Sequence, residues 1–263
     1  MQSKMRFIIS PAKKMNVADD MFAWRDLPRL LPQTEQILDK LRALSYEELK
    51  SVWKCSDKLA VLNYERVRNM SLLRGLSPAV FSYEGIQYQH LAPQVMTADQ
   101  LEYLQEHLRI LSGFHGVLRP FDGVTPYRLE MQAKLPVAGS KDLYDFWGSQ
   151  LFGVLREESG VIVNLASVEY GKAIEEHAKR AALAGDRDVR MVTCLFGTLK
   201  DGKLVQRSTE AKAARGSFMR WCAENQVESP EEFVSYDVMG YRYCDRLSVR
   251  HCSFEKLVFV KDA

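Results

Sequence analysis

The strand-to-loop junction I-I-S-P-A-K-K, residues 8–14, is the first segment whose residue types could do chemistry. The stretch R-F-I-I-S predicts a strand that ends at Ser10, because the proline that follows cannot continue a ladder of backbone hydrogen bonds. Lys13 would then present a cation at the edge of a sheet, where α/β proteins often bind ligands. A solvated lysine after a turn is the alternative. The glycines that a phosphate-binding P-loop requires are absent here.

A second segment, L-R-I-L-S-G-F-H-G-V-L-R-P at 108–120, places two glycines three residues apart between two apolar stretches. This spacing resembles a helix-hairpin-helix element, in which backbone N–H groups near Gly113 and Gly116 could bind a phosphate. Arg109 and Arg119 flank the glycines and could add charge. Because phosphate contacts do not read base sequence, the DNA binding implied would be sequence-independent. A tight turn with no ligand is the alternative.

A third segment, E-A-K-A-A-R-G-S-F-M at 210–219, predicts a helix with a basic face. Lys212, Arg215, Gly216 and Met219 share that face through spacings of three and four residues. Glycine inside a helix is unfavourable by about 1 kcal/mol relative to alanine, so it makes sense where another backbone or a ligand comes close. The sequence therefore predicts an anion-binding face here.

The segment P-Y-R-L-E-M at 126–131 places Arg128 and Glu130 on one side of an extended chain. Opposite charges so arranged usually form a structural or surface ion pair. A functional role requires that they face a cavity.

Polar residues also follow the apolar run V-I-V-N-L, in the segment V-N-L-A-S-V-E-Y at 163–170. Ser167 is a natural N-cap for a helix, and Glu169 in the first turn would complement the helix dipole. The second interpretation is that Asn164, Ser167 and Tyr170 line a polar site at the end of the strand.

No nucleophile motif accompanies the five histidines, and no zinc-binding pattern accompanies the five cysteines. Cys244, His251 and Cys252 are close in sequence, but their spacing matches no common metal site. The sequence thus indicates neither a metal nor another cofactor, and it favours a non-enzymatic function over catalysis.

Alternating helical and strand patterns must position these residues. Apolar spacing predicts helices at about 37–44, 97–111, 141–156 and 209–224. Further helices are expected after the capping box of Ser45 and Glu48 and from Ser167 onward. Apolar runs predict strands at 161–165, 189–196 and 256–260, with a hairpin at Asp201-Gly202. The order is not a regular βαβ repeat, so we expect a mixed α/β fold in which helices surround a mixed sheet.

Composition is that of an ordinary globular protein, with 46% hydrophobic and 27% charged residues among 263. No linker or repeat divides the chain, so residues 1–263 are expected to form one domain. The net charge of +2 is too small for a global attraction to nucleic acid, so any such binding needs a local basic patch. No apolar run could cross a membrane, and none at the N-terminus suits a signal peptide. We therefore expect a cytoplasmic protein.

Several of these segments together resemble one known family. The segments are I-S-P-A-K near the start, S-D-K-L-A at 56–60, L-S-G-F-H-G-V-L-R-P-F-D at 111–122, P-Y-R-L-E-M at 126–131, L-Y-D-F-W at 143–147, N-L-A-S-V-E-Y at 164–170 and K-A-A-R-G-S-F-M at 212–219. They occur in the order found in the YaaA family and span nearly the whole chain. Lys14, the segment 81–91 and the hairpin sequence L-S-G-F-H-G depart from the more usual family pattern.

The resemblance implies a cytosolic protein that protects cells against hydrogen peroxide by limiting free iron and oxidative DNA damage. It implies an unusual single-domain α/β topology with a helix-hairpin-helix-like element at residues 111–116. It also implies a basic cleft that binds double-stranded DNA. The cleft would draw on Lys13, Lys58, Arg128, Lys212 and Arg215.

Two hypotheses for function remain open. The first is binding of duplex DNA through its phosphates, with Lys13, Arg109, Arg119, Lys212 and Arg215 as contacts. The second is an enclosed polar pocket for a small phosphate- or carboxylate-bearing ligand, with walls from Ser10, Lys13, Asn164, Ser167, Tyr170, Lys212 and Arg215. The sequence does not distinguish the two, and it does not indicate an oligomeric state.

Overall fold

Among the described residues, five parallel strands form the centre of the structure, in the order β13-β9-β8-β1-β5. The computed structural model describes residues 5–18, 22–186, 188–251 and 253–261. The five strands are β1 (Arg6–Ile9), β5 (Leu108–Ser112), β8 (Val161–Asn164), β9 (Arg190–Lys200) and β13 (Phe254–Lys261). β1 is covered on both faces, since Phe7, Ile8 and Ile9 are at most 1% exposed. Such burial is typical of parallel strands between helical layers.

Antiparallel strands extend both edges of this sheet. β6 (Gly116–Leu118) pairs with β5, β12 (Tyr241–Tyr243) pairs with β13, and β11 (Asp237–Val238) pairs with β12. β10 (Lys203–Val205) forms a hairpin with β9, as the Asp-Gly turn predicts. Two short sheets lie apart, pairing β2 (Lys14–Met15) with β4 (Tyr83–Glu84) and β3 (Ser77–Pro78) with β7 (Gly123–Val124). The predicted fold class, a mixed sheet with surrounding helices, is confirmed.

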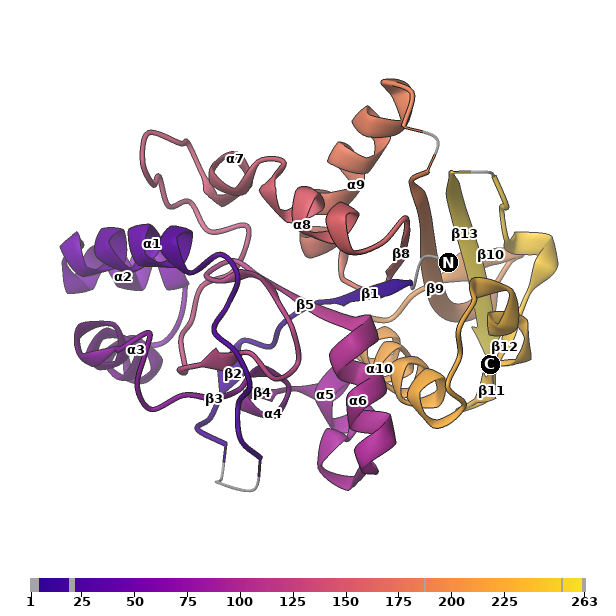
Figure 1. Cartoon of the computed structure of the whole chain (residues 1–263), viewed down its shortest axis with the longest axis horizontal. Coiled ribbons are helices and arrows are strands. Elements are labelled where there is room, and N and C mark those ends of the chain that lie inside the picture. Colours follow the sequence, from indigo (N-terminus) through magenta and orange to yellow (C-terminus); the bar gives the residue numbers. More distant parts are fainter. Residues whose placement is uncertain (1–4, 19–21, 187, 252, 262–263) are drawn as a thin grey trace.

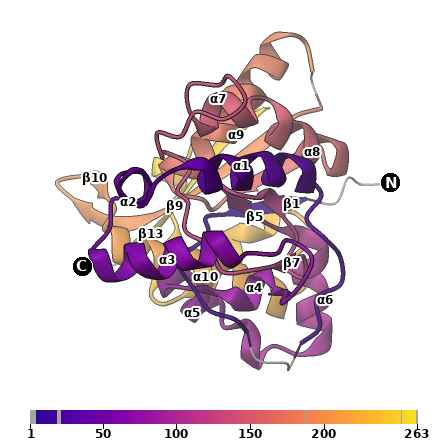
Figure 2. The same ribbon diagram turned by 90° about the vertical axis from the view of Figure 1, so that its left-hand side faces the viewer.

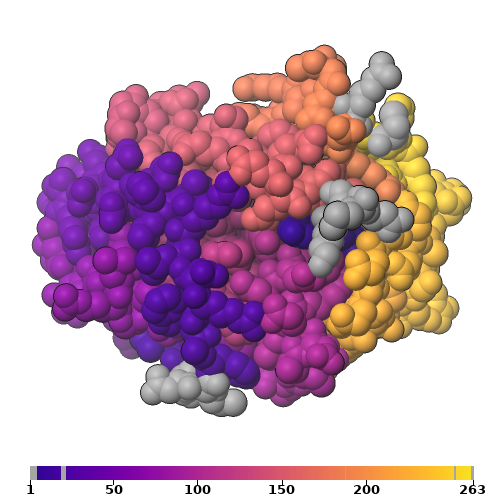
Figure 3. Space-filling view, viewed as in Figure 1, coloured from indigo at the N-terminus to yellow at the C-terminus, as the bar shows by residue number. Residues whose placement is uncertain are grey.

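Helices cover both faces of the sheet (Figure 1). α8 and α9 lie on one side and α6 and α10 on the other, while α1, α2 and α3 group together beyond the β5–β6 edge (Figures 1 and 2). In the space-filling view the N-terminal residues lie against the middle of the chain, and the C-terminal residues lie at the opposite end (Figure 3). The helices are α1 (Leu31–Ala43), α2 (Tyr46–Trp53), α3 (Asp57–Asn69), α4 (Ala79–Ser82), α5 (Ile86–Leu91), α6 (Ala98–His107), α7 (Leu143–Trp147), α8 (Gln150–Glu158), α9 (Val168–Leu183) and α10 (Ser208–Glu224).

The order of strands creates a crevice at the carboxyl ends of β1 and β8. These strands are neighbours, and the backbone N–H of Leu165 donates to the carbonyl of Ile8 just beyond them. From β1 the chain proceeds to β5 on one side, whereas from β8 it proceeds to β9 on the other. Connections that leave adjacent strands in opposite directions open a space at their carboxyl ends, which is where open α/β sheets bind ligands.

The helix-hairpin-helix expected at 108–120 is wrong, because the structure has a β-hairpin there. α6 ends at His107, and the chain continues directly into β5, which turns back as β6. Every residue of β5 is buried, so the spacing of Leu108 and Leu111 marks a fully covered strand instead of one helix face. Gly113 is required because a Cβ there would lie 3.0 Å from backbone atoms of 129–131, and Gly116 has φ +77°. Both glycines therefore serve close packing inside the protein.

The two arginines that flank this hairpin are held in ion pairs. Arg109 is 4% exposed, and its Nε donates to Glu158 at 2.7 Å, an acceptor that it shares with Arg6 at 3.2 Å. Arg119 donates through Nε to the buried Asp122 at 3.0 Å. The expectation that both arginines contact DNA phosphates is wrong for Arg109, because its side chain is buried. The guanidinium of Arg119 is already paired with Asp122.

Helix α10 packs against α5 at its central glycine. A Cβ on Gly216 would lie 2.1 Å from the carbonyl oxygen of Gln87, so only glycine allows the two backbones to come this close. The unfavourable helix propensity of this glycine is thus explained by packing, one of the two reasons that the sequence allowed. This contact brings the basic face of α10 next to the segment that precedes α5.

We expect Gly216→Ala to lower the free energy of unfolding by about 2–3 kcal/mol, because a methyl group overpacks the contact with α5. Gly153→Ala on α8 is the matched control: no atom lies within 4 Å of its Cβ position. That change should stabilise the protein by about 0.5–1 kcal/mol, since alanine is the better helix former. Chemical denaturation measures both, and equal effects of the two substitutions would contradict this account of α5–α10 packing.

We expect Glu158→Ala to destabilise the protein by about 3 kcal/mol, because it leaves Arg6 and the buried Arg109 without their shared acceptor. The adjacent Glu157 pairs with Arg29 at the surface, where its side chain is 66% exposed. Glu157→Ala should therefore change stability by less than about 1 kcal/mol. Urea denaturation at neutral pH compares the two variants, and a small loss for Glu158→Ala would show that this ion-pair cluster is not structural.

Candidate functional site

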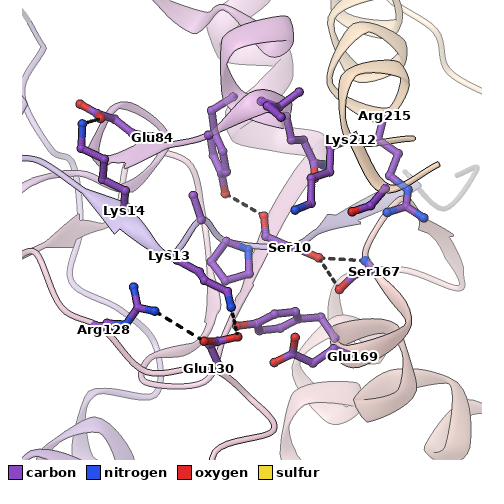
Figure 4. Close-up of a pocket in the computed structure, with 18 of the residues that line it drawn as sticks. Ser10, Lys13, Lys14, Glu84, Arg128, Glu130, Ser167, Glu169, Lys212 and Arg215 are labelled. Atoms are coloured by element: carbon purple, nitrogen blue, oxygen red, sulfur yellow. Dashed lines mark hydrogen bonds and ion pairs between the residues drawn. The ribbon is translucent and has the colours of Figure 1, made fainter. Parts of the chain in front are cut away.

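A cavity of about 600 Å³ lies in the crevice beyond the carboxyl ends of β1 and β8 (Figure 4). Segments far apart in the sequence meet around it. Its lining comes from residues 10–14, 84–88, 127–130 and 167–170, together with Ser208, Lys212 and Arg215 of α10. The volume falls within the range of about 300–1,000 Å³ usual for small-molecule sites.

Two serines join the loops that leave β1 and β8. The Ser10 hydroxyl donates to Ser167 Oγ at 3.1 Å and accepts from the Ser167 backbone N–H at 2.8 Å. Tyr88 donates its hydroxyl hydrogen to the Ser10 carbonyl at 3.0 Å, which fixes the loop from the other side. Ser167 is the N-cap residue of α9, as predicted, but its side chain makes no capping hydrogen bond. The positive end of the α9 dipole therefore faces the cavity without a side-chain cap.

One face of α10 supplies two basic groups to the cavity. Ser208, Lys212 and Arg215 point to it, whereas Gly216 and Met219 are buried against α5 and the core, so the predicted four-residue face is divided. Within the described residues, neither Lys212 nor Arg215 has an ion-pair partner in the cavity wall (Figure 4). The Nε of Arg215 is buried without an acceptor, and burial lowers the pKa of this guanidinium.

The opposite wall holds an ion-paired cluster. Lys13 Nζ lies 2.8 Å from Glu130 Oε2, and Arg128 Nη2 lies 3.9 Å from Glu130 Oε1. Arg128 is largely buried, and its Nε also has no acceptor among the described residues. Lys14 and Glu84 form a further ion pair at the rim. Among the described residues, both arginines of this cavity therefore have a buried Nε–H without an acceptor.

Glu169, in the first turn of α9, also faces the cavity (Figure 4). It accepts a hydrogen bond from the Gln132 backbone N–H at 3.2 Å. Burial raises its pKa, and the nearby carboxylate of Glu130 adds to this effect, whereas Lys13 opposes it. Glu169 is thus a carboxyl group whose surroundings favour a hydrogen-bond donor or a positive charge close by.

Tyrosine side chains form the inner wall. The Tyr127 hydroxyl lies 2.7 Å from that of Tyr83 and 2.5 Å from Ser112 Oγ. Burial raises the pKa of Tyr127 to about 12, so the phenol is neutral at physiological pH. Together with Tyr88 and Tyr170 it gives the cavity a rigid wall with few charges.

The cavity brings together many of the residues that the sequence singled out. Those that line it are Ser10, Lys13, Arg128, Glu130, Ser167, Tyr170, Lys212 and Arg215. They come from two loops, the N-terminus of α9 and the helix α10, which the sequence patterns present as separate candidates.

Other predicted site residues lie elsewhere. Asn164 is buried and structural: it donates to Glu175 and accepts from the Ala166 backbone N–H. Lys58 is exposed on α3 and is not part of the cavity wall. Arg109 and Arg119 line a separate cavity of about 240 Å³. Gly113, Gly116 and Gly216 serve internal packing, as shown above.

The sequence interpretation missed the wall formed by residues 84–88. Glu84, Gln87 and Tyr88 line the cavity because β4, which directly precedes α5, pairs with β2, a contact between distant segments. No motif or periodicity in Y-E-G-I-Q-Y marks these residues. Ser208 and Tyr127 were also missed, although each lies within one helical or strand spacing of a residue that was selected.

No group of three or more His, Cys, Asp or Glu side chains in the described part of the chain is arranged to hold a metal ion. Cys252, named with Cys244 and His251 as a possible ligand, lies outside the described residues. Burial lowers the pKa of His115 to about 3, so this histidine is neutral in the folded protein. None of the helices in the described ranges is long and apolar enough to cross a membrane.

Comparison with known proteins identifies the family. Residues 5–247 match the family described as peroxide stress protein YaaA. A UPF0246 protein of Lachnoclostridium phytofermentans is 49% identical over 257 residues, which cover 98% of this chain and 96% of the relative. A UPF0246 protein of Pediococcus pentosaceus is 49% identical over 258 residues, with 98% of each chain covered. One from Desulfitobacterium hafniense is 43% identical over 257 residues, again with 98% of each covered. The resemblance read from the sequence is confirmed, and the chain belongs to the YaaA family of peroxide stress proteins.

Proposed function

We propose that the protein acts in the peroxide stress response by binding a small phosphate- or carboxylate-bearing ligand in the cavity between β1, β8 and α10. One observation carries this proposal. Arg128 and Arg215 both line the cavity, and the Nε of each is buried without an acceptor in the described structure. A buried donor on a charged group is unfavourable by about 1–3 kcal/mol or more unless it is hydrogen-bonded, and an anion in the cavity would stabilise the charge of each guanidinium through its other N–H groups.

The charge of the lining supports an anion. Five basic side chains and three carboxylates face the cavity, which leaves an excess of two positive charges. They are Lys13, Lys14, Arg128, Lys212 and Arg215 against Glu84, Glu130 and Glu169. The excess is concentrated on α10, since Lys13 and Lys14 already have carboxylate partners. An anion at Lys212 and Arg215 would also meet the α9 N-terminus and the two serine hydroxyls.

Inorganic phosphate should bind saturably at one site per chain and raise the melting temperature. Lys212→Ala and Arg215→Met should each weaken this binding about tenfold or more, because each removes a charged hydrogen-bond donor. Lys203→Ala, which removes an exposed lysine of β10 outside the cavity, is the control and should leave binding unchanged. Calorimetric titration measures phosphate binding by the unaltered protein and by the three variants. Absence of binding, or equal binding by every variant, would contradict the proposal.

Binding of double-stranded DNA is a second candidate, favoured by the exposed lysines at the cavity mouth. The side chains of Lys13 and Lys14 are 63% and 71% exposed, and Lys212 is also exposed. These three could contact successive phosphates without reading the bases, and a protein so bound could limit iron-driven oxidation of the DNA. A double helix is too wide to enter the cavity itself, so Arg215 would not take part.

If DNA binds at this rim, affinity for two unrelated duplexes should be similar and should fall steeply as salt rises. The double substitution Lys14→Glu with Lys212→Glu removes about two phosphate contacts. It should therefore reduce the steepness of the slope of log K against log salt by roughly 1.8. Lys179→Glu with Lys203→Glu changes the net charge equally at exposed positions outside the rim and should leave the slope unchanged. Equal losses in both double variants would indicate only a general charge effect.

A further inference from the structure

The cavity has a defined anion-binding end. The first turn of α9 opens onto it, and α9 is a helix of 16 residues, long enough for a full terminal dipole. Ser167 makes no capping hydrogen bond to this turn, and its hydroxyl accepts from Ser10. Arg215 and Lys212 face the same end, and the buried Nε of Arg215 lacks an acceptor among the described residues. A phosphate group can accept from N–H, O–H and guanidinium donors at once, which matches this set.

The excess charge of the lining suits one phosphate and little more. A phosphate monoester carries about −1.5 to −2 at neutral pH, close to the two unmatched positive charges. A single carboxylate would leave one cation unmatched, whereas a second phosphate would exceed the available positive charge. The remainder of the ligand should therefore be uncharged.

The carboxylates of Glu130 and Glu169, on the wall opposite α10, call for hydrogen-bond donors. Glu130 is already paired with Lys13 and lies near Arg128. Glu169 has a backbone N–H as a partner but, in the described structure, no basic side chain within ion-pair distance. Hydroxyl groups on a ligand could donate to this carboxylate. At the corresponding crevice of doubly wound sheets, carboxylates bind the hydroxyls of ribose in this way.

We propose that the ligand is a hydroxyl-bearing phosphate monoester, with its phosphate at the α9 N-terminus, Lys212 and Arg215 and its hydroxyls donating to Glu169. This inference rests on the proposed small-anion function and specifies its chemistry. The cavity of about 600 Å³ has room for a polyol phosphate or for a mononucleotide. These two sources share the chemistry and differ in whether a planar base is also recognised.

Matched pairs of probes separate the phosphate from the hydroxyls. Glycerol 3-phosphate and propyl phosphate differ in two hydroxyls without a base. Adenosine 5′-monophosphate and its 2′,3′-dideoxy analogue also differ in two hydroxyls, but both carry a base. Adenosine keeps the base and the hydroxyls and lacks the phosphate. By calorimetric titration, the hydroxylated member of at least one pair should bind about tenfold more tightly, as a charge-assisted hydrogen bond provides. Adenosine should bind at least about a hundredfold more weakly than its monophosphate, because it loses the ionic contacts.

Glu169→Gln tests the position of the hydroxyls. The amide keeps the size of the side chain and can still accept from Gln132, so the fold should be retained. The preference for the hydroxylated probe should fall from about tenfold to about threefold, since the neutral acceptor is roughly half as strong. Affinity for inorganic phosphate should not decrease. Glu176→Gln, on the exposed side of the same helix, is the control and should keep the full preference.

The outcomes separate this inference from the proposed function. If inorganic phosphate binds but neither pair shows a preference, the cavity is an anion site and the hydroxyl inference is wrong. It is equally wrong if the preference exists and Glu169→Gln leaves it unchanged. If neither phosphate nor any phosphate ester binds, both the proposed function and this inference fail. Tighter binding of the nucleotide pair than of the glycerol pair would identify a base-recognising site, and the reverse order a polyol phosphate site.

Discussion

The hydrogen bonds between Ser10 and Ser167 are the contact on which the site depends. They join the loops that follow two neighbouring parallel strands, and so they fix the start of α9 relative to the end of β1. Ser167 accepts from Ser10 and makes no capping hydrogen bond to α9, and the positive end of the helix stays open to the cavity. Lys13, three residues after Ser10, is placed by the same loop. One pair of small hydroxyl residues thus sets both the shape of the cavity and part of its charge.

A second constraint places the basic face of α10. The contact between Gly216 and the Gln87 carbonyl sets how near α10 lies to α5, and the same turns of these two elements contribute Arg215 and Gln87 to the cavity wall. Stability and site geometry are therefore coupled at this position: a side chain that separated the helices would also withdraw the guanidinium from the cavity. This explains why a glycine that is unfavourable for the helix occurs next to the basic residues.

Much of the fold and part of the site could be predicted from the sequence, and the errors have physical causes. The strand before Ser10, the helix after Ser167 and the helix over 209–224 follow from strong local patterns. The segment 108–112 was misread because a strand covered on both faces loses its alternation, and its leucines then match helical spacing by chance. Likewise, ion pairing of Arg109 with Glu158, 49 residues away, could not be read from spacing. Each sequence motif predicts its own site residues, and only the order of the strands determines which of them meet.

The depth of each cation determines what the cavity can recognise. Lys13 and Lys14 lie at the rim with carboxylate partners, where water screens charge and an added anion gains little. Arg215 lies deeper, where the effective dielectric constant is lower and the same charge attracts an anion more strongly. Most of the binding energy is therefore available only to a group small enough to reach the inner wall. A polymer held at the rim meets the weaker set of charges, whereas a phosphate inside the cavity meets the stronger one, and this difference favours a small ligand over a duplex as the partner for which the site is built.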